Sequence, residues 1–440
     1  RVIMGVRTVN LTYSESGGTL LPGYLPGSDY FGMSNYDGKL RPGWEFVSGW
    51  QNYGYAEKAF RNGLLTPDSA LNDPFNMNET RRFNARANIE PFNGLKIDLT
   101  TNHSEASNLT EFFTADENGN LPDPAQRGKV ESGNFSMSYI SLGTAFEGID
   151  NKVESSKSFA KLKDEYRKII SGRLASEYFS KTGVVLPPDS ANPEYASGYG
   201  PTSQDVLIPA FLAAYAGKDP NEVSLSARRS FLEALPNWQV RFDGLGRIES
   251  FRKYVNSITI NHAYRSTYSI GSFISNPFFI DTINGAPFLR DLDGNFMVEY
   301  NINTISLNEQ FSPLFDLNMD WKNSLTTRLE IKRSRTIALN MANTQVNEVN
   351  NSEIVLGAGY RFNEVPLIIN QKEFRSDLNV RFDFSWRNSR TVIRKLEDVS
   401  GSEITAGQKI LSIKASADYM LSDKFSVRAF YDQRLTTPYI

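Results

Sequence analysis

The sequence contains no cysteine and only two histidines, His103 and His262, among its 440 residues. The lack of cysteine excludes disulfides, thiolate metal sites and cysteine nucleophiles. A serine–histidine–acid triad would have to use one of the two histidines. Both lie in or beside strand-like segments, so we interpret them as structural residues. We therefore expect no catalytic residue, no enzymatic activity and no cofactor.

The chain also lacks a clear excess of charge and any long hydrophobic run. Its 47 basic and 50 acidic side chains give a formal net charge of -3, whereas a broad nucleic-acid-binding surface needs a basic excess. No apolar run reaches the roughly eighteen residues of a transmembrane helix. The mean hydropathy of -0.40, taken alone, is typical of a soluble protein.

Metal-binding patterns are equally scarce. Residues 291–295 place oxygen ligands at alternate positions, as a calcium loop does. The glycine, however, stands at the fourth position of this segment and not at the sixth, which the helix–loop–helix calcium motif requires. We predict a hairpin turn there and no metal site.

Neither end of the sequence looks like a natural terminus. Arg1 is not an initiator methionine, and residues 2–5 have neither the charged start nor the apolar core of a signal peptide. The sequence stops at residues 436–440, directly after a strand-like run. We expect the chain to be part of a longer protein.

The main signal is an alternation of apolar and polar residues with a period of two. Only an extended strand places two such sets on opposite faces. The alternation is clearest in residues 378–387. It recurs in the segments 83–89, 95–99, 135–139, 315–321, 354–362, 411–419 and 425–431.

A longer segment, residues 325–343, allows two interpretations. Its apolar positions all stay odd-numbered, but Arg333 and Arg335 interrupt the apolar face midway. The segment is either one strand of nearly twenty residues or a hairpin that turns at residues 333–335. A strand of that length far exceeds the usual five or six residues.

Soluble β-sandwiches also alternate, but their strands are short. Here the strand-like runs often reach ten residues or more, and their polar faces are dense in Arg, Asp, Asn, Lys and Ser. Aromatic residues fall at or near the expected strand ends: Trp321, Tyr360, Phe362, Trp386 and Tyr419. This combination is typical of outer-membrane barrels, whose apolar faces contact lipid and whose polar faces line a water-filled lumen. We predict an all-β chain, namely a segment of a very large transmembrane antiparallel β-barrel with a partly helical loop insertion.

The alternation assigns residues to the two sides of that barrel wall. The residues expected to face lipid are Leu378, Val380, Phe382, Phe384, Trp386, Leu411, Ile413, Phe425 and Val427. The residues expected to face the lumen are Asn379, Arg381, Asp383, Arg387, Thr326, Arg328, Glu330 and Lys332.

Three parts follow one another along the chain. Residues 1–150 contain perhaps five strands with long loops. Residues 151–235 form a mostly helical insertion. Apolar spacings of three and four predict a helix around residues 159–170. Residues 204–215 favour a second, more apolar helix, and residues 222–234, which follow Asp219-Pro220, a third. Residues 236–440 return to barrel hairpins with roughly eight to ten strands. These parts together give roughly fourteen strands. If the rest of the protein also forms strands, the barrel is larger than a porin, and its lumen must be either an open channel or plugged.

Several stretches, in this order, resemble one family. They are residues 10–15 and 21–24, 206–215, 235–238 and 242–245, 262–268, 309–314, 319–328 and 355–362. Together these stretches are similar to the C-terminal part of the SprA (Sov) family, the outer-membrane translocon of the type IX secretion system in Bacteroidota. The resemblance implies that at least one closing strand is missing after residue 440.

The resemblance implies a protein-conducting channel. Through it, folded proteins with a C-terminal secretion signal would pass from the periplasm to the cell surface, including adhesins in species with gliding motility. It also implies a lateral opening in the barrel wall, occupied by a small barrel partner of the PorV type or by a plug protein. The partners expected are therefore these two proteins, secreted cargo and outer-membrane lipid.

Two other classes of protein fit the residue pattern. One is a nutrient-uptake or porin-like outer-membrane barrel, although multi-helical loops are unusual in porins. The other is a soluble β-rich surface or adhesion protein. The alternation by itself does not distinguish a translocon from an uptake barrel.

Overall fold

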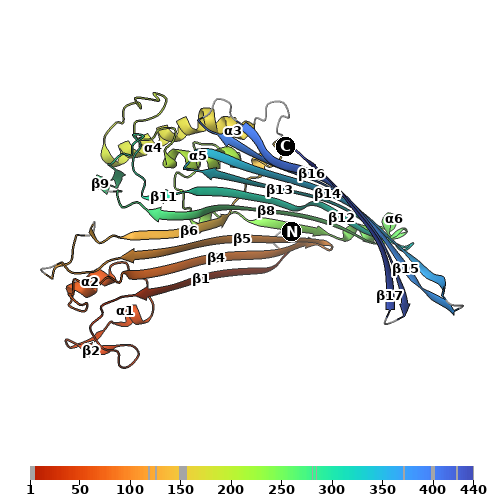
Figure 1. Ribbon diagram of the computed structural model, residues 1–440, viewed down its shortest axis with the longest axis horizontal. Helices are drawn as coiled ribbons and strands as arrows, with labels where there is room; N and C mark the ends of the chain where they lie inside the picture. The colour runs from red at the N-terminus through yellow and green to blue at the C-terminus, as the bar shows by residue number, and fades with distance from the viewer. Residues whose placement is uncertain are drawn as a thin grey trace.

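Most of the chain forms one antiparallel sheet of 13 strands that runs along the whole molecule (Figure 1). The computed structural model describes residues 5–116, 119–123, 126–147, 156–279, 281–283, 285–369, 372–397, 402–422 and 425–439. The expectation of an all-β chain is confirmed. The sequence also predicts a tight turn at residues 422–423, between the alternating segments 411–419 and 425–431, and this turn lies partly outside the described residues.

The long strands are β1 Val6–Leu20, β4 Phe75–Phe92, β5 Leu95–Glu111, β6 Val130–Ser138, β8 Val255–Ser275, β12 Thr304–Trp321, β13 Leu325–Asn340, β14 Gln345–Ile369, β15 Lys372–Lys395, β16 Ser402–Ser422 and β17 Phe425–Pro438. They pair in this order, and within the described residues β1 and β17 are the two edges of the sheet. With 25 and 24 residues, β14 and β15 are several times longer than the usual strand of about five or six.

Six short strands complete the fold. They are β2 Ser34–Tyr36 with its partner β3 Lys39–Arg41, β7 Asn237–Phe242, β9 Asp281–Ile283 with its partner β10 Ala286–Pro287, and β11 Tyr300–Ile302. In the described part of the chain, residues 1–150 thus hold six strands and residues 236–440 hold eleven, one more in each case than the alternation suggested. The short strands are too brief to produce a visible alternation.

Strand β13 decides between the two interpretations of residues 325–343. Leu325–Asn340 is one strand of 16 residues, and it pairs with β14 without a shift in register. The hairpin at residues 333–335 is therefore wrong. Arg333 and Arg335 belong to the middle of a continuous strand, and their role is explained by what covers them.

One strand position in the sheet is interrupted. Both β6 and β7 lie between β5 and β8: β6 pairs with residues 103–110 of β5, and β7 pairs with residues 95–100. The chain leaves the sheet after Ser138 and returns at Asn237 to continue in the same position. The helical insertion is thus attached in the middle of a strand position and not at a loop between two complete strands.

The helices lie in three connections. Between β1 and β4 are α1 Trp44–Val47 and α2 Tyr55–Arg61; between β6 and β7 are η3 Leu142–Thr144, α3 Lys157–Lys161, η4 Leu162–Tyr166, α4 Arg167–Thr182, α5 Gln204–Ala216 and η5 Phe231–Glu233; between β7 and β8 are η6 Gly244–Arg247 and α6 Glu249–Arg252. None of the described helices combines the length and apolar character needed to cross a membrane.

Two of the three predicted insertion helices are present, and the third prediction is wrong. Residues 222–234 form turns and the short η5 instead. Serine hydroxyls in this segment bond to nearby backbone groups, as Ser226 Oγ does to the Arg228 carbonyl at 2.7 Å, and such local bonds compete with a helix. Arg228 also reaches down to Glu105 of β5 at 3.4 Å, which holds the segment against the sheet.

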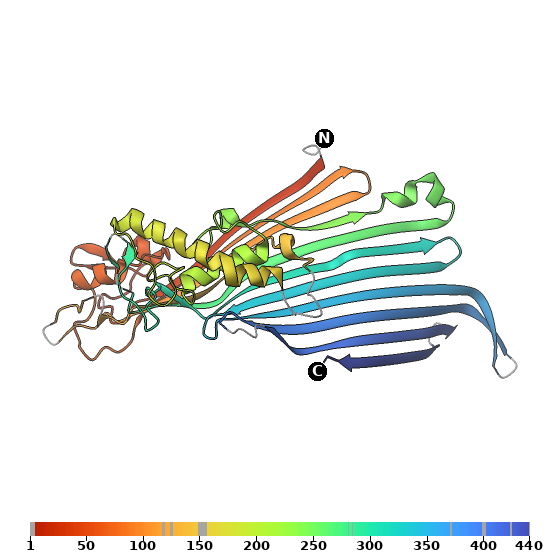
Figure 2. The ribbon, with the colours of Figure 1, turned by 90° about the horizontal axis from the view of Figure 1, so that it is seen from above.

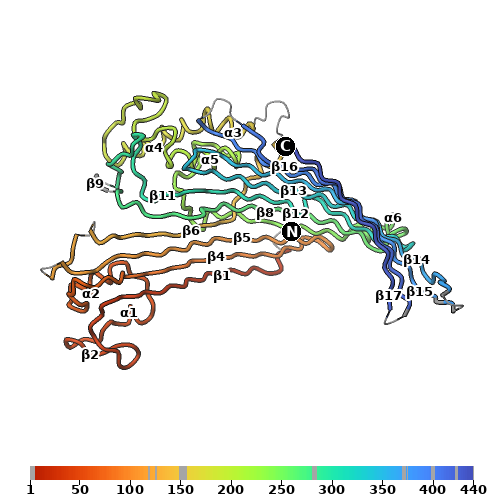
Figure 3. The backbone as a smooth tube through the Cα atoms, in the orientation of Figure 1, coloured from red at the N-terminus to blue at the C-terminus, as the bar shows by residue number. Residues whose placement is uncertain are grey.

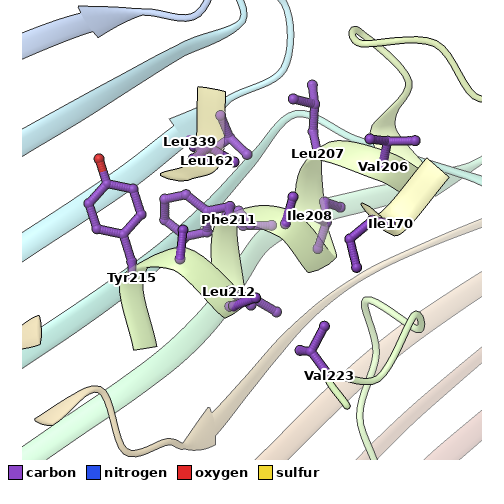
Figure 4. Close-up of a cluster of buried hydrophobic side chains, with 14 of the residues drawn as sticks. Leu162, Ile170, Val206, Leu207, Ile208, Phe211, Leu212, Tyr215, Val223 and Leu339 are labelled. Atoms are coloured by element: carbon purple, nitrogen blue, oxygen red, sulfur yellow. The ribbon is translucent and has the colours of Figure 1, made fainter. Parts of the chain in front are cut away.

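Helix α5 forms the centre of the main hydrophobic core. Every residue from Val206 to Ala216 is buried, which is expected of a helix that is apolar on all sides. In Figure 4 its side chains point in several directions, with Leu162 of η4, Ile170 of α4 and Leu339 of β13 around them. Figure 2 shows the yellow and green helices of the insertion lying over one half of the sheet.

The connections at the two ends of the sheet differ greatly in length. At the end where α1, α2 and β9 lie, the chain makes the connections 21–74, 112–129 and 276–303 (Figure 3). At the other end, β4 and β5 are joined by residues 93–94, and β12 and β13 by residues 322–324. The longest connections thus gather at one end, together with the shorter connections 341–344 and 396–401, and the other end has mostly short turns.

Candidate functional site: the two faces of the sheet

The strand register brings the apolar residues of many strands onto one face. Phe384 of β15 lies opposite both Leu356 of β14 and Ile413 of β16, and Leu356 lies opposite Leu329 of β13. We call the resulting surface the apolar band. It includes Leu11, Ala85, Ala87, Ile97, Leu99, Val240, Phe242, Ile260, Leu317, Leu329, Ile331, Ile354, Leu356, Val380, Phe382, Phe384, Leu411, Ile413 and Val427.

Of the residues expected to face lipid, the register places all but Phe425 on this face, since Phe425 lies opposite Ser422 beyond a shift in register. Trp386 lies opposite Leu411, and Leu378 lies opposite Tyr419, which in turn lies opposite Val427. Large apolar side chains of the band are solvent-exposed, with Phe382 at 46% and Leu356 at 46%. Contiguous exposure of this kind is unusual on a monomeric soluble protein and marks an interaction surface. That this surface contacts lipid remains a prediction.

The band has a limited height along the strands. On β15 it runs from Leu378 to Trp386, which spans ~26 Å at about 3.3 Å per residue. This is comparable to the ~25 Å apolar band of outer-membrane barrels. Beyond Trp386 the same face of β15 continues with the polar Asn388 and Arg390.

Aromatic residues lie at the limits of the band and not at the strand ends. Trp386, Tyr360 and Phe362 were expected at strand ends, but β14 and β15 extend well beyond them, so that expectation is wrong for these three residues. Tyr360 lies opposite Val380, and Phe362 opposite Leu378, the last band residue of β15. The expectation fails because regular alternation ends before the strands do: β15 continues beyond Trp386 with polar residues on both faces, and β14 continues beyond Phe362 through a shift in register.

The opposite face carries the residues expected to face the lumen. Thr326 and Arg381 flank Gly359 in one row of the sheet, and Lys332 and Arg387 flank Glu353 in another. Their charges are largely compensated within the sheet: Arg328 Nη2 and Lys332 Nζ lie 2.7 and 2.9 Å from Glu330 Oε2. This face is therefore polar and mixed in charge.

Two glycines on β14, Gly357 and Gly359, leave space on the polar face. At Gly357 an added β-carbon would lie 2.9 Å from Asp383 Oδ1, and at Gly359 it would lie 2.6 Å from Thr326 Oγ1. The space between β13 and β15 forms a depression of about 210 Å³ that Arg328, Arg381 and Asp383 help to line. The sequence indicated close packing at these glycines, and the structure shows that neighbouring polar side chains fill the space they leave.

The helical insertion covers the same face that carries the apolar band. On β13, Leu329 and Ile331 belong to the band, whereas Ile337 and Leu339 further along the same face pack in the core under α5. The rows between them contain Arg333 and Arg335. One continuous face thus has an open apolar part and a part covered by helices.

A buried ion pair lies at the boundary between these two parts. Arg335 Nη2 is 3.1 Å from Glu309 Oε2 on the adjacent β12, and the two side chains are 5% and 2% exposed. Arg335 Nη1 also donates to the Thr144 carbonyl of the insertion at 2.8 Å. Sequence reasoning noticed the arginine but missed Glu309, although this acid shares the parity of the apolar Leu307 and Phe311.

Both histidines bond to backbone carbonyls. His103 Nε2 lies 3.1 Å from the Arg229 carbonyl, and His262 Nδ1 lies 2.7 Å from the Leu314 carbonyl. Residues 291–295 form a turn in which the Asp291 carboxylate accepts the backbone N–H of Asn295 at 2.8 Å. Among the described residues, no group of three or more His, Cys, Asp or Glu side chains is arranged to hold a metal ion.

Comparison with known proteins identifies no relative of the chain. No protein-family model matches the chain, and a search of curated proteins finds no match either. The two faces of the sheet are therefore the observations on which a function can be argued.

Proposed function

We propose that the chain forms part of the wall of a large outer-membrane β-barrel through which proteins are exported. The observation that carries the proposal is the two-sided sheet, with an apolar band of limited height on one face and mixed charges on the other. A sheet with these properties can be solvated by lipid on one side and by water on the other. A soluble sandwich would instead cover the apolar face with a second sheet.

The unequal connections suggest how this wall is oriented. Outer-membrane barrels have short periplasmic turns and longer extracellular loops. The connections 21–74, 112–129 and 276–303 meet at one end of the sheet, and the insertion covers the half of the sheet nearer that end. We place that end at the cell surface and the short turns at residues 93–94 and 322–324 in the periplasm.

Export of folded proteins is the finer part of the proposal and follows from the resemblance to the SprA (Sov) family. The polar face supports it, because Glu330 and Glu353 balance Arg328, Lys332 and Arg387 along the wall. A lining without a strong charge of one sign can pass many cargo surfaces without binding any of them tightly. A PorV-type small barrel and a plug protein are the partners proposed at the lateral opening.

Deletion of the gene tests the proposal in the cell. We expect cargo with a C-terminal secretion signal to accumulate in the periplasm, measured by fractionation and immunoblotting. Normal secretion combined with the loss of uptake of a nutrient would replace the translocon with an uptake barrel. Recovery of the full-length protein in the aqueous phase after detergent phase separation would contradict a membrane barrel of either kind.

A further inference from the structure

Three cations border the apolar band on the same face of the sheet. The last row of the band toward the insertion places Trp386 of β15 opposite Leu411 of β16. Residues two apart on a strand share a face, so the next two rows can be read from the register. The first contains Arg333 of β13 and Lys409 of β16, and the second contains Arg390 of β15. We call Arg333, Arg390 and Lys409 the basic rim.

No described acid neutralises the basic rim. The Arg390 side chain makes no hydrogen bond and no ion pair with a described residue. The Arg333 guanidinium lies 5.3 Å from the centre of the Phe146 ring, and Lys409 Nζ lies 5.2 Å from the centre of the Tyr439 ring. An aromatic ring attracts a cation but carries no net charge. The three positive charges therefore stay uncompensated within the described part of the chain.

The acids of the same face are already engaged. In the two rim rows of the described strands β12 to β17 the only acid is Glu309, and it is paired with Arg335 at 3.1 Å. One row further on, Glu348 is paired with Arg394 at 3.1 Å. The other uncharged positions of the rim rows are mostly polar: Ser352, Asn388, Thr437 and Asn350. The rim thus presents positive charge and hydrogen-bonding groups.

The opposite face of the same strands is mixed in charge. There Arg387 Nη2 lies 3.9 Å from Glu353 Oε2, and Lys414 Nζ lies 3.5 Å from Asp432 Oδ2. Arg381 lines the same depression as Asp383. A positive charge that no acid accompanies is what distinguishes the band face at this height.

The height of the rim matches the headgroup layer of a membrane. The row of Arg333 and Lys409 lies one step of two residues beyond Trp386, which is about 7 Å. The headgroup region on each side of the hydrocarbon core is about 5–8 Å thick. Arginine and lysine stems let the charged ends reach further along the surface, so Arg390 can contact the same layer from the next row. At the other limit of the band, the next row on β14 and β15 holds Val365 opposite Ser376 and no cation.

We propose that the basic rim binds the phosphate groups of a glycolipid in the outer leaflet of the membrane. The inference rests on the proposed function, because it takes the apolar band as the lipid-facing surface and the insertion end as the cell surface. Arg333 and Lys409 are separated by three strand spacings, about 14 Å, so the rim offers its cations across the width of a lipid headgroup. Arginine suits phosphate oxygens because its N–H donors form a planar fork, and lysine and arginine near an anionic membrane surface strengthen attachment to it.

Titration of the purified full-length protein in a neutral detergent tests the rim. The probes are diphosphoryl lipid A and the same lipid without its two phosphates, and binding is followed by microscale thermophoresis. We expect the wild type to bind the diphosphoryl form at least about tenfold more tightly, and Arg390→Gln/Lys409→Gln to lose most of this preference. Lys414→Gln/Arg434→Gln removes the same charge from the polar face of β16 and β17 and should keep it.

Equal binding of the two lipids by the wild type, or an equal loss in the two double variants, would overturn the inference. Displacement of the lipid by inorganic phosphate at a similar concentration would also overturn it, because the site would then recognise a free ion. Detergent phase separation keeps the two proposals apart. A wild type that enters the detergent phase without preferring phosphate refutes the rim alone, whereas recovery in the aqueous phase refutes the barrel wall and the rim together.

Discussion

Asn237 donates a hydrogen bond from Nδ2 to Ser138 Oγ at 3.2 Å, although the two residues are separated by almost a hundred positions in the chain. They are the last residue of β6 and the first residue of β7. Each also accepts a backbone N–H from a neighbouring strand: Ser138 Oγ from Asn102 at 2.9 Å, and Asn237 Oδ1 from Ser266 at 2.7 Å. Side chains thus replace the ladder bonds that the interrupted strand position would otherwise leave unmade.

The first prediction concerns this junction. Asn237→Ala removes the acceptor of the Ser266 N–H, and both residues are buried. An unsatisfied buried donor costs about 1–3 kcal/mol, and we expect a loss of that size in the free energy of unfolding of the full-length protein. Gln239→Ala, an exposed position two residues further on, should change it little. Equal losses in the two variants would assign no special role to the junction.

The second prediction concerns the ion pair beneath the insertion. Arg335→Met leaves the Glu309 carboxylate buried without its cation, and breaking one side of a buried pair costs about 3–5 kcal/mol. Arg333→Met removes a guanidinium that lies 5.3 Å from the centre of the Phe146 ring and forms no ion pair among the described residues. We expect Arg335→Met to detach the insertion, measured as faster proteolysis between residues 139 and 236, and Arg333→Met to remain resistant. Equal proteolysis of both would contradict this role of the pair.

Much of the sheet could be predicted from the sequence, because apolar and polar residues alternate along a strand whose two faces have different surroundings. Leu378 to Trp386 indicates both a strand and its apolar side, and the register confirms that these residues share one face with Leu411 and Ile413. Alternation is a local property. It therefore could not show that β14 and β15 continue past the apolar residues, or that β6 and β7 share one position in the sheet.

The parts that escaped prediction depend on contacts between distant segments. Arg335 interrupted an apolar face without visible reason, and its partner Glu309 lies on another strand under an insertion that no local pattern places there. The sequence predicts a helix at residues 222–234, but Arg228 and the serine hydroxyls hold this segment in another conformation.

The third prediction tests the assignment of the two faces. Phe382 and Arg381 are adjacent on β15 but belong to opposite faces. Phe382→Arg places a charge in the apolar band, which costs about 2–4 kcal/mol at the middle of a membrane, and should impair assembly into the outer membrane. Arg381→Ser on the polar face should assemble normally. Assembly is measured by heat-modifiable mobility of the full-length protein, and similar defects in both variants would refute the assignment.

The last prediction concerns the dependence of stability on pH. The Asp205 carboxyl has its pKa raised from 3.8 to about 6 by burial, Glu177 and Glu299, while Lys181 is already engaged with Glu177 and Tyr199 is the phenol nearby. The folded protein therefore holds this proton more tightly than the unfolded chain does. Stability from this group is present at low pH and is lost as the pH rises through about 6.

Asp205→Asn removes this titration, because an amide carries no proton to lose. The difference between about 6 and 3.8 corresponds to at most about 3 kcal/mol. We expect the variant to be more stable than the wild type above pH 6, and the gap to shrink toward pH 4, in unfolding followed at a series of pH values. Glu222→Gln should keep the wild-type profile. A variant that is less stable than the wild type at pH 8 would mean that the Asp205 carboxylate is held by favourable contacts, because only a charge that costs free energy in the folded state can be removed with a gain.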